Sequence, residues 1–561
     1  MKAARLQAWT IGTALLALSA VAAAQTRDYY GTLEPFASDA VYFVLTDRYV
    51  NGDPGNDQRD QGGPDPATRS FDRPVPGAPV GESDNVGYLG GDFKGLLANA
   101  GYIRDLGFGA VWLTPIVDNP DQAFTGGEAV TWGGAFQDRG KTGYHGYWGV
   151  DFYRLDEHLP SPGLDFAALT AGLRRHGLKT VLDIVANHGS PSFTMPRDQS
   201  GFGELYRDGV LVADHQNLAP AQLDPARNRL HRYFHAEPDL VQLSNLDDGN
   251  PEVMDYLVGA YSQWIAQGVD ALRIDTIRHM QLPFWKAFSD RIRAQRPGMF
   301  MFGEAFDYDA GKIAPFTWAE NGGVSVLDFP LKQRMAEVFG RSGAGYQRLR
   351  DRLYLRRGPY ANPYELMTFY DNHDMPRLDA SDEGFIDAHH WLFTARGIPV
   401  IYYGSETGFM RGRAEHAGNR NYYGQTRIDA AADSPIYRQL RRIARARAAT
   451  PALQRGLQLD LELRGNRATF YRVYQHDGQQ QIALVLLNKG DAPAEFAVRR
   501  YLQPGQWREA LDGEVVEVPE RGRLTTTVPA HGAKVFVLDA PVTRADLARQ
   551  LDRLMRRAVV R

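Results

Sequence analysis

The sequence contains no cysteine among its 561 residues. Disulfide bonds, thiolate metal sites and a cysteine nucleophile are therefore excluded. An excess of positive charge is also absent, because 63 basic residues stand against 67 acidic ones, so no overall basic field predicts a nucleic-acid partner. Hydrophobic residues make up 43% of the chain and charged residues 23%, which indicates a globular protein and not a disordered one.

Beyond the N-terminus, the sequence lacks a hydrophobic run long enough to span a bilayer. The N-terminal run extends from Ala8 to Ala24, follows Lys2 and Arg5, and ends in small residues. This pattern predicts a secretory signal peptide over residues 1–24, because the run is too short and too rich in alanine for a membrane anchor. We therefore expect a periplasmic or secreted bacterial protein that is cleaved near Ala24, is monomeric and has no stable membrane anchor.

Short apolar runs alternate with helical patterns across the middle of the chain. Their nearly continuous hydrophobic character is typical of parallel strands buried on both faces, and eight of them predict a (β/α)8 barrel. An open doubly wound sheet is the alternative, but no glycine-rich dinucleotide-binding turn follows the first strand. The predicted strands are Ala40–Thr46, Ala110–Leu113, Thr180–Val185, Ala271–Asp275, Met299–Glu304, Val324–Leu327, Leu366–Asp371 and Pro399–Tyr403.

The predicted barrel consists of residues 25–188 and 241–450. Residues 189–240, after the third strand, are long and weakly patterned, which predicts an inserted subdomain. Residues 451–540 carry short strands between turn residues and predict an antiparallel β-sandwich. Residues 541–561 predict a basic helix, for which packing on its own domain is favoured over a membrane surface. Its apolar stripe is formed by Leu547, Leu551, Leu554 and Met555.

Acidic side chains follow three of the predicted strands at their C-terminal ends, where barrel enzymes place their active sites. They are Asp275, Glu304 and Asp374. One such acid alone is more often a solvated residue, but three, each beside Arg, His or Gly, indicate a catalytic site. Glycoside hydrolysis needs two carboxylates, one that attacks the anomeric carbon and one that donates a proton. A further carboxylate can stabilise the positively charged transition state.

Six segments of the chain resemble signature segments of the α-amylase family of glycoside hydrolases. Each alone is modestly specific, but their order across residues 38–450 is very specific. The resemblance implies a barrel enzyme that acts on α-glucans. The segments are Gly107–Pro115, Asp183-Ile-Val-Ala-Asn-His188, Gly268-Val-Asp-Ala-Leu-Arg-Ile-Asp-Thr-Ile-Arg-His279, Phe302-Gly-Glu304, Phe369-Tyr-Asp-Asn-His-Asp374 and Gly397–Gly404.

The resemblance implies a role for each acid. Asp275 would be the nucleophile that forms a covalent glucosyl intermediate, Glu304 the acid and then the base, and Asp374 a ligand of the distorted sugar. Arg273 would keep Asp275 ionised, while the neighbouring carboxylates would keep Glu304 protonated. A retaining mechanism requires the carboxyl groups of Asp275 and Glu304 to lie about 5–5.5 Å apart. The other implied substrate-binding residues are His145, Tyr147, Trp148, Asp183, His188, Arg273, Arg278, His279, Phe306, His373 and Arg377.

The resemblance also implies bound Ca²⁺, for which hard oxygen ligands are suited. Residues 46–57 resemble the calcium loop of cyclodextrin glucanotransferases and related amylases, where a later Gly-Gly-Asp completes the site. The implied ligands of this first site are Asn51, Asp53, Asn56, Asp57, Gly90 and Asp92. A second site would use Asn187, Asn245 and the carbonyl of His279. Asn245 departs from the usual Asp of the family, which removes one negative charge.

Two features bear on the activity within the family. The Arg278-His279 pair resembles the Lys-His that holds the glucan on the leaving-group side in α-amylases and glucanotransferases. Val241 stands in place of the aromatic residue that guides ring closure in cyclodextrin-forming enzymes, and the sequence ends soon after the predicted sandwich, without room for a starch-binding module. We therefore expect an α-amylase-type retaining hydrolase of α-1,4-glucosidic bonds in starch, dextrins or malto-oligosaccharides. A glucanotransferase or cyclomaltodextrinase-type activity is one alternative, and a non-catalytic glucan-binding protein is another.

Overall fold

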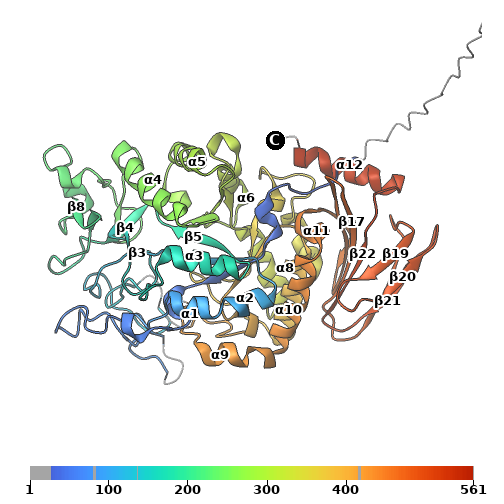
Figure 1. Ribbon diagram of the computed structural model, residues 1–561, viewed down its shortest axis with the longest axis horizontal. Helices are drawn as coiled ribbons and strands as arrows, with labels where there is room; N and C mark the ends of the chain where they lie inside the picture. Colours follow the sequence, from blue (N-terminus) through green and yellow to red (C-terminus); the bar gives the residue numbers. More distant parts are fainter. Residues whose placement is uncertain (1–26, 80–83, 135–136, 415–417, 560–561) are drawn as a thin grey trace, which may run out of the picture.

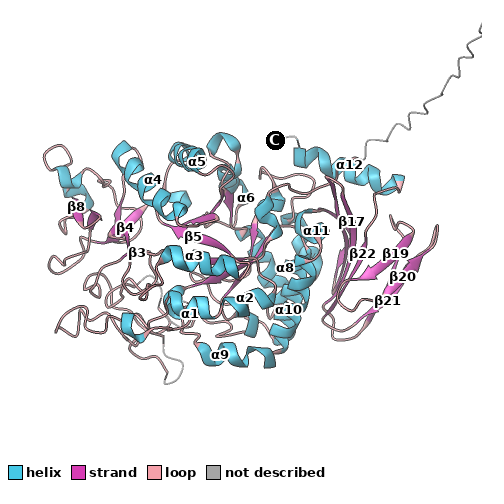
Figure 2. Ribbon diagram, in the orientation of Figure 1, coloured by secondary structure: helices cyan, strands magenta, loops and turns pink. Residues whose placement is uncertain are grey.

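The computed structural model describes residues 27–79, 84–134, 137–414 and 418–559. Helices and strands alternate in one part of the molecule, whereas the C-terminal part consists almost entirely of strands with one helix at its edge (Figures 1 and 2). The predicted signal peptide lies outside the described residues. Within the described part of the chain, no helix is both long enough and apolar enough to cross a bilayer.

A parallel sheet of eight strands forms the predicted barrel. Its order is β12-β11-β10-β5-β2-β1-β14-β13, and a parallel bridge between Leu327 and Met367 joins the two ends. This confirms the fold class predicted from the apolar runs. The strands are β1 (Val41–Val44), β2 (Ala110–Leu113), β5 (Lys179–Ile184), β10 (Ala271–Ile274), β11 (Phe300–Gly303), β12 (Ser325–Val326), β13 (Met367–Thr368) and β14 (Ile398–Tyr402).

Helices surround the barrel and bury one face against it. In α4, Asn250 caps the first turn by accepting a hydrogen bond from Glu252 N, and Pro251 occupies the first position, where a missing N–H costs nothing. The main helices are α1 (Phe93–Ala98), α2 (Ala100–Leu106), α3 (Phe166–Arg175), α4 (Pro251–Ala266), α5 (Leu282–Gln295), α6 (Ala310–Ile313), α7 (Phe329–Phe339), α8 (Asp382–Thr394), α9 (Gln425–Ala430), α10 (Pro435–Ala448) and α11 (Pro451–Arg455).

A four-stranded sheet stands beside the barrel and takes strands from two loops. Its order is β3 (Val117–Asp118), β4 (Asp151–Leu155), β7 (Glu204–Arg207) and β8 (Val210–Asp214). The predicted insertion at residues 189–240 therefore shares its sheet with the segment after β2. The reason is that β2 and β5 are neighbours in the barrel, so the loops that follow them emerge side by side. A short pair, β6 (His188–Pro191) and β9 (Leu243–Asn245), joins the two ends of the insertion.

The C-terminal part is the predicted antiparallel β-sandwich. One sheet has the order β15-β16-β17-β22-β19-β20, and β18 pairs with β21 in the other. The strands are β15 (Leu457–Arg464), β16 (Arg467–His476), β17 (Gln479–Asn488), β18 (Ala494–Val498), β19 (Gly505–Glu509), β20 (Val515–Val518), β21 (Leu524–Val528) and β22 (Gly532–Leu538). Leu484, Trp507 and Phe536 are buried between the sheets.

Helix α12 (Ala545–Val559) lies across the ends of the sandwich strands (Figure 1). Leu547, Leu551 and Leu554 are buried in the same core as the strands, which is the packing that the sequence favoured over a membrane surface. The first described residues also bind the helix, because Asp552 accepts hydrogen bonds from Arg27 and Tyr29.

Candidate active site

Asp183, Arg273, Asp275 and Glu304 lie together at the C-terminal ends of three neighbouring barrel strands. Strand β10 pairs with β5 and β11, and this register sets Arg273 opposite Asp183. The ladder continues past the strands, since Asp275 N donates to Ile184 O and Glu304 N donates to Ile274 O, both at 2.8 Å. The backbone pairing therefore fixes the two acids that the sequence placed at these strand ends.

The guanidinium of Arg273 contacts three carboxylates. Its Nη1 atom lies 2.8 Å from Asp183 Oδ1 and 2.8 Å from Asp275 Oδ1, and its Nη2 atom lies 2.8 Å from Glu304 Oε2. The Arg273 side chain has no exposed surface. One cation thus holds the predicted nucleophile and the predicted acid on neighbouring nitrogens of one planar group.

Burial raises the affinity for protons of two of these carboxyl groups. Burial raises the pKa of Glu304 well above its usual value, and the charges of Asp374 and Asp275 add to this effect, while Arg273 opposes it. Burial likewise raises the pKa of Asp183 to about 7, again opposed by Arg273. Glu304 therefore holds a proton near neutral pH, as a general acid must.

Asp374 is held from two sides by cationic or polar groups. Its Oδ2 atom lies 3.1 Å from His373 Nε2, and Arg420 Nη2 lies 2.5 Å from its Oδ1. Arg420 also donates to the His373 carbonyl at 2.9 Å. The sequence did not predict Arg420, because it lies in a loop and belongs to none of the signature segments.

The aromatic segment after residue 143 contributes buried groups to the same site. Tyr147 donates from its hydroxyl to Asp183 Oδ2 at 2.8 Å and stacks on His373, with ring centroids 5.2 Å apart. His145 accepts a hydrogen bond from Tyr147 N through Nδ1, and burial lowers its pKa well below the usual value. His188 is also buried, and its Nδ1 atom has no hydrogen-bond partner among the described residues.

Two predicted sugar ligands have surroundings that differ from an open cleft. Trp148 packs in a hydrophobic cluster with Phe124, Met195 and Phe202. Arg377 is buried and donates to Tyr403 O at 2.9 Å while its guanidinium lies over the Tyr402 ring. A direct contact of either side chain with a sugar stays a prediction, and the structure gives both of them packing roles.

Arg278 and Phe306 lie at the edge of the site. Arg278 donates to Phe306 O at 2.5 Å and lies 3.1 Å from Asp307 Oδ2. Phe306 is 47% exposed and Val241 is 56% exposed. These apolar groups are therefore available to a ligand.

The residues of the first predicted calcium site fit a hard cation. Asn51 Oδ1 and Asn56 Oδ1 are buried without a hydrogen-bond donor among the described residues. A Cβ at Gly90 would lie 2.3 Å from both Asn51 Nδ2 and Asp57 Oδ1, so only glycine lets the backbone approach this closely. The Asp92 carboxylate accepts from Gly52 N and Asp53 N. Asp53 itself turns its side chain toward Gly55 N and Lys94.

The second predicted site gains a carboxylate that the sequence did not predict. Asp239 accepts a hydrogen bond from Asn187 Nδ2 at 3.1 Å and lies 2.9 Å from His279 Nδ1. The Oδ1 atoms of Asn187 and Asn245 are buried without partners among the described residues. The oxygen donors fit Ca²⁺, and Asp239 restores the charge that Asn245 lacks.

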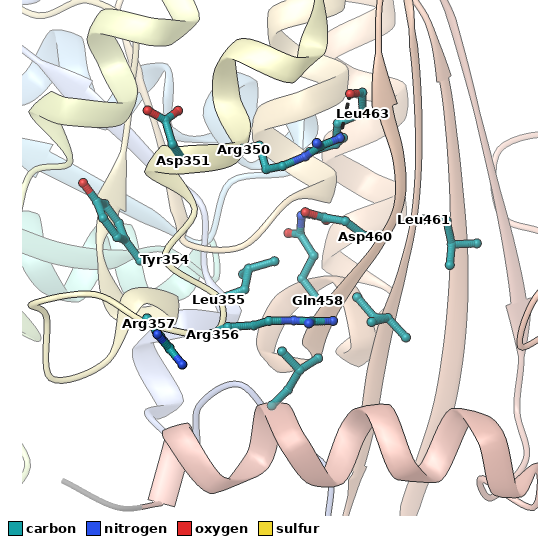
Figure 3. A pocket seen from close by; sticks show the side chains of 12 residues that line it. Arg350, Asp351, Tyr354, Leu355, Arg356, Arg357, Gln458, Asp460, Leu461 and Leu463 are labelled. Atoms are coloured by element: carbon teal, nitrogen blue, oxygen red, sulfur yellow. Dashed lines mark hydrogen bonds between the residues drawn. The ribbon is translucent and has the colours of Figure 1, made fainter.

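A cavity of about 510 Å³ lies at the junction of the barrel and the sandwich (Figure 3). It is lined by Arg356 and Tyr354 from the chain between α7 and β13, by Gln458 from β15 and by Leu554 from α12. Segments that lead from a helix into the next strand lie at the opposite end of a barrel from the catalytic loops. This cavity is therefore no part of the candidate active site.

Comparisons with known proteins agree with this geometry. The family model described as alpha amylase, catalytic domain, matches residues 43–439. A cyclomaltodextrin glucanotransferase of Klebsiella oxytoca is 28% identical over 547 residues, covering 89% of this chain and 78% of that protein. The chain spans 63% of the similar enzyme from Bacillus sp. strain 38-2.

Solved structures give the same result. A cyclomaltodextrin glucanotransferase with a three-domain ABC distribution, CldA, shares 29% identity, with a TM-score of 0.70 and coverage of 90% of this chain and 99% of that one. An α-amylase from Geobacillus thermoleovorans, solved with acarbose, shares 25% identity, with a TM-score of 0.67 and coverage of 90% and 99%. Since the family match covers more than half of the sequence, the chain belongs to the α-amylase family.

Proposed function

We propose that this protein is a retaining glycosidase that cleaves α-1,4-glucosidic bonds in starch, dextrins or malto-oligosaccharides. The observation that carries the proposal is the contact of one buried guanidinium with both Asp275 and Glu304, 2.8 Å from each. This arrangement supports the short separation of the two carboxyl groups that retention needs. The raised pKa of Glu304, caused mainly by burial, supports its assignment as the proton donor.

The proposed reaction has two displacements. In the first, a carboxylate oxygen of Asp275 attacks the anomeric carbon while the Glu304 proton moves to the glycosidic oxygen, and the bond to the leaving chain breaks. In the second, ionised Glu304 accepts a proton from water as the water oxygen displaces Asp275. Two inversions at one carbon retain its configuration.

Other groups would support these steps. Asp374, 32% exposed at its side chain, is open to sugar hydroxyls, and the rings of Tyr147 and His373 form a stacked wall beside it. Asp183 stays behind Arg273 and has no exposed side-chain surface. We therefore assign Asp183 to positioning Arg273 and not to direct sugar contact.

Hydrolysis is favoured over glucan transfer by the residue at position 241. Val241 offers a small exposed side chain where an aromatic ring would support cyclisation. Transfer is the second candidate, because similar proteins are named cyclomaltodextrin glucanotransferases. A non-catalytic role is the weakest candidate, since the proposed catalytic carboxylates and the buried Arg273 are all present. These carboxylates are Asp275, Glu304 and Asp374.

Incubation with maltoheptaose tests the proposal. We expect shorter linear products, with the α-anomer formed first by proton NMR, and no activity in Asp275→Asn. The matched control is Asp290→Asn, whose carboxylate pairs with Lys286 on the surface. A wild-type protein that forms no product, or an Asp275→Asn variant that remains fully active, would contradict the proposed enzymatic function. Cyclic or longer products on chromatography would favour the transferase.

We also propose that bound Ca²⁺ stabilises the loops beside the candidate active site. The first site would use Asn51, Asn56, Asp57 and Asp92 with the backbone at Gly90. The second would use Asn187, Asn245 and the carbonyl of His279, together with Asp239. Export to the periplasm or the medium, with cleavage near Ala24, is proposed as well, and N-terminal sequencing of the exported protein tests it.

A further inference from the structure

The loop after β14 runs between the first candidate calcium site and Asp374. In the barrel, β14 pairs with β1 on one side and with β13 on the other. The loop after β1 carries the ligands Asn51 to Asp57 of the candidate calcium site, and the loop after β13 carries Asp374. Parallel barrel strands send the loops that follow them to the same end of the barrel. Residues 419–424 of the β14 loop, named here the bridge segment, contact both neighbours.

One end of the bridge segment holds the turn that carries Asp374. Asn419 has no exposed surface, and its Nδ2 atom donates to His373 O at 2.6 Å and to Met375 O at 3.1 Å. The next residue, Arg420, donates to Asp374 Oδ1 at 2.5 Å. The position of Asp374 therefore depends on the position of the bridge segment.

The other end of the bridge segment is bound to the chain that leads into the calcium loop. Tyr423 N donates to Arg48 O and Gly424 N donates to Tyr49 O, both at 2.8 Å. In return, Arg48 Nε donates to the carbonyl of Arg420 at 2.9 Å. The two stretches of chain thus lie side by side.

Tyr422 extends this contact to a proposed calcium ligand. Its hydroxyl accepts a hydrogen bond from Asn51 N at 2.8 Å. The Asn51 side chain donates to Asp57 Oδ1 at 2.7 Å, and its own Oδ1 is buried without a donor among the described residues. A cation bound to that oxygen would fix Asn51, and the hydrogen bond from Asn51 N would then fix Tyr422.

We infer that Tyr422 is a positioning residue that couples the first candidate calcium site to Asp374, so that Ca²⁺ and the glucan strengthen each other's binding. This inference rests on the proposed function and on the proposed calcium site. Ordering the bridge segment costs conformational entropy, and a segment that one ligand has already ordered costs the second ligand less. Because coupling between two binding sites is reciprocal, the glucan must raise the affinity for Ca²⁺ by the factor by which Ca²⁺ raises the affinity for the glucan.

The test measures calcium binding and not activity. The background protein carries Asp275→Asn, which leaves maltoheptaose uncleaved, and Asp239→Asn, which removes a negative charge from the second candidate calcium site. Calorimetric titration with Ca²⁺ gives a Kd with and without saturating maltoheptaose. We expect the glucan to lower this Kd about fivefold or more. Adding Tyr422→Phe should bring the two values together, because the hydroxyl that accepts from Asn51 N is then absent.

The matched control is Tyr471→Phe, which loses a hydroxyl that donates to Arg500 O in the sandwich and should keep the full effect of the glucan. A background protein that does not bind maltoheptaose contradicts the proposed function and this inference together. Glucan binding without calcium binding refutes the calcium site and the coupling, but not the glycosidase. Binding of both ligands without any effect of one on the other, or with an effect that Tyr422→Phe leaves unchanged, refutes the role of Tyr422 alone.

Discussion

Arg273 and Asp183 form an ion pair at 2.8 Å, and neither side chain has any exposed surface. The second oxygen of Asp183 accepts hydrogen bonds from Tyr147 Oη and Trp112 Nε1, at 2.8 and 2.9 Å. Asp183 is therefore fully occupied by protein groups. It acts on the reaction through Arg273, which contacts Asp275 and Glu304 directly, and through its charge, which helps to raise the pKa of Glu304.

We predict that Asp183→Asn lowers the pH at which activity is lost on the alkaline side. The Asp183 charge helps to raise the pKa of Glu304, whereas Arg273 lowers it, so removing that charge should lower the pKa of Glu304. Unpairing one contact of the buried guanidinium should also lower the free energy of unfolding by about 1–3 kcal/mol. Rate profiles against pH and urea unfolding measure the two effects. An alkaline limb at the wild-type pH would contradict the assignment.

We predict that Glu304→Gln abolishes the alkaline limb itself. The first step needs the protonated carboxyl, so wild-type activity should fall as the pH rises through the elevated pKa of Glu304. An amide does not titrate, and loss of the acid should lower kcat on maltoheptaose by about 10²–10⁴-fold. A nitrophenyl maltoside, whose leaving group needs no proton, should still glycosylate Asp275. Equal losses on both substrates would argue against Glu304 as the acid.

The barrel could be predicted because buried parallel strands appear in the sequence as continuous apolar runs. The run Ala110–Leu113 has the same bounds in the structure as in the prediction. Three strands of the sandwich could not be predicted, among them β19, in which Trp507 is buried while its neighbours Gln506 and Arg508 are exposed. Glu509 is buried too, but it is charged, so one apolar side chain is all that the strand offers to a hydrophobic pattern, and the pairing of β19 with β22 makes the strand.

The candidate site also has a part that could be predicted from the sequence and a part that could not. The acids at strand ends could be predicted, since strand register brings consecutive barrel positions together, and Arg273 lies beside Asp275 on one strand. Asp239 and Arg420 could not, because each lies in a loop and meets its partner across about 40 residues or more of intervening chain. Such contacts depend on the path that each loop takes through space. The loop sequences have no periodic pattern from which that path could be predicted.

We predict that calcium removal lowers the melting temperature. A ligand bound only by the folded state at 100 times its Kd stabilises that state by about 2.7 kcal/mol. Thermal unfolding with chelator and with added Ca²⁺ measures the difference, and calorimetric titration gives the number of sites.

Two variants assign the sites separately. Asp92→Asn keeps the oxygen that caps α1 through Gly95 N but removes a negative charge from the first site. Asp239→Asn removes a negative charge from the second site. Each should reduce the calcium-dependent gain, and together they should remove it. An unchanged gain in the double variant would exclude both sets of ligands.

The last prediction concerns an acidic cluster in the four-stranded sheet region. Oxygen atoms of Asp118, Asp121 and Glu157 lie within 4.8 Å of one another. Burial, together with the charges of Asp156 and Glu157, raises the pKa of Asp118 to about 8, and burial raises that of Glu157 to about 7. The folded protein therefore keeps protons that the unfolded chain releases above about pH 4.

The contribution of this cluster to stability must consequently fall as the pH rises from about 4 to 8, because its folded form binds more protons than its unfolded form over that range. Asp118→Asn removes the titrating group and keeps its shape, so we expect the variant to gain at least about 1 kcal/mol over the wild type at pH 8 and much less at pH 5. Urea unfolding at both pH values, in the presence of chelator, measures the gain, with Asp290→Asn as the surface control. Because an amide and a protonated carboxyl are nearly the same size, a gain that is equal at both pH values would mean that packing and not proton binding is responsible.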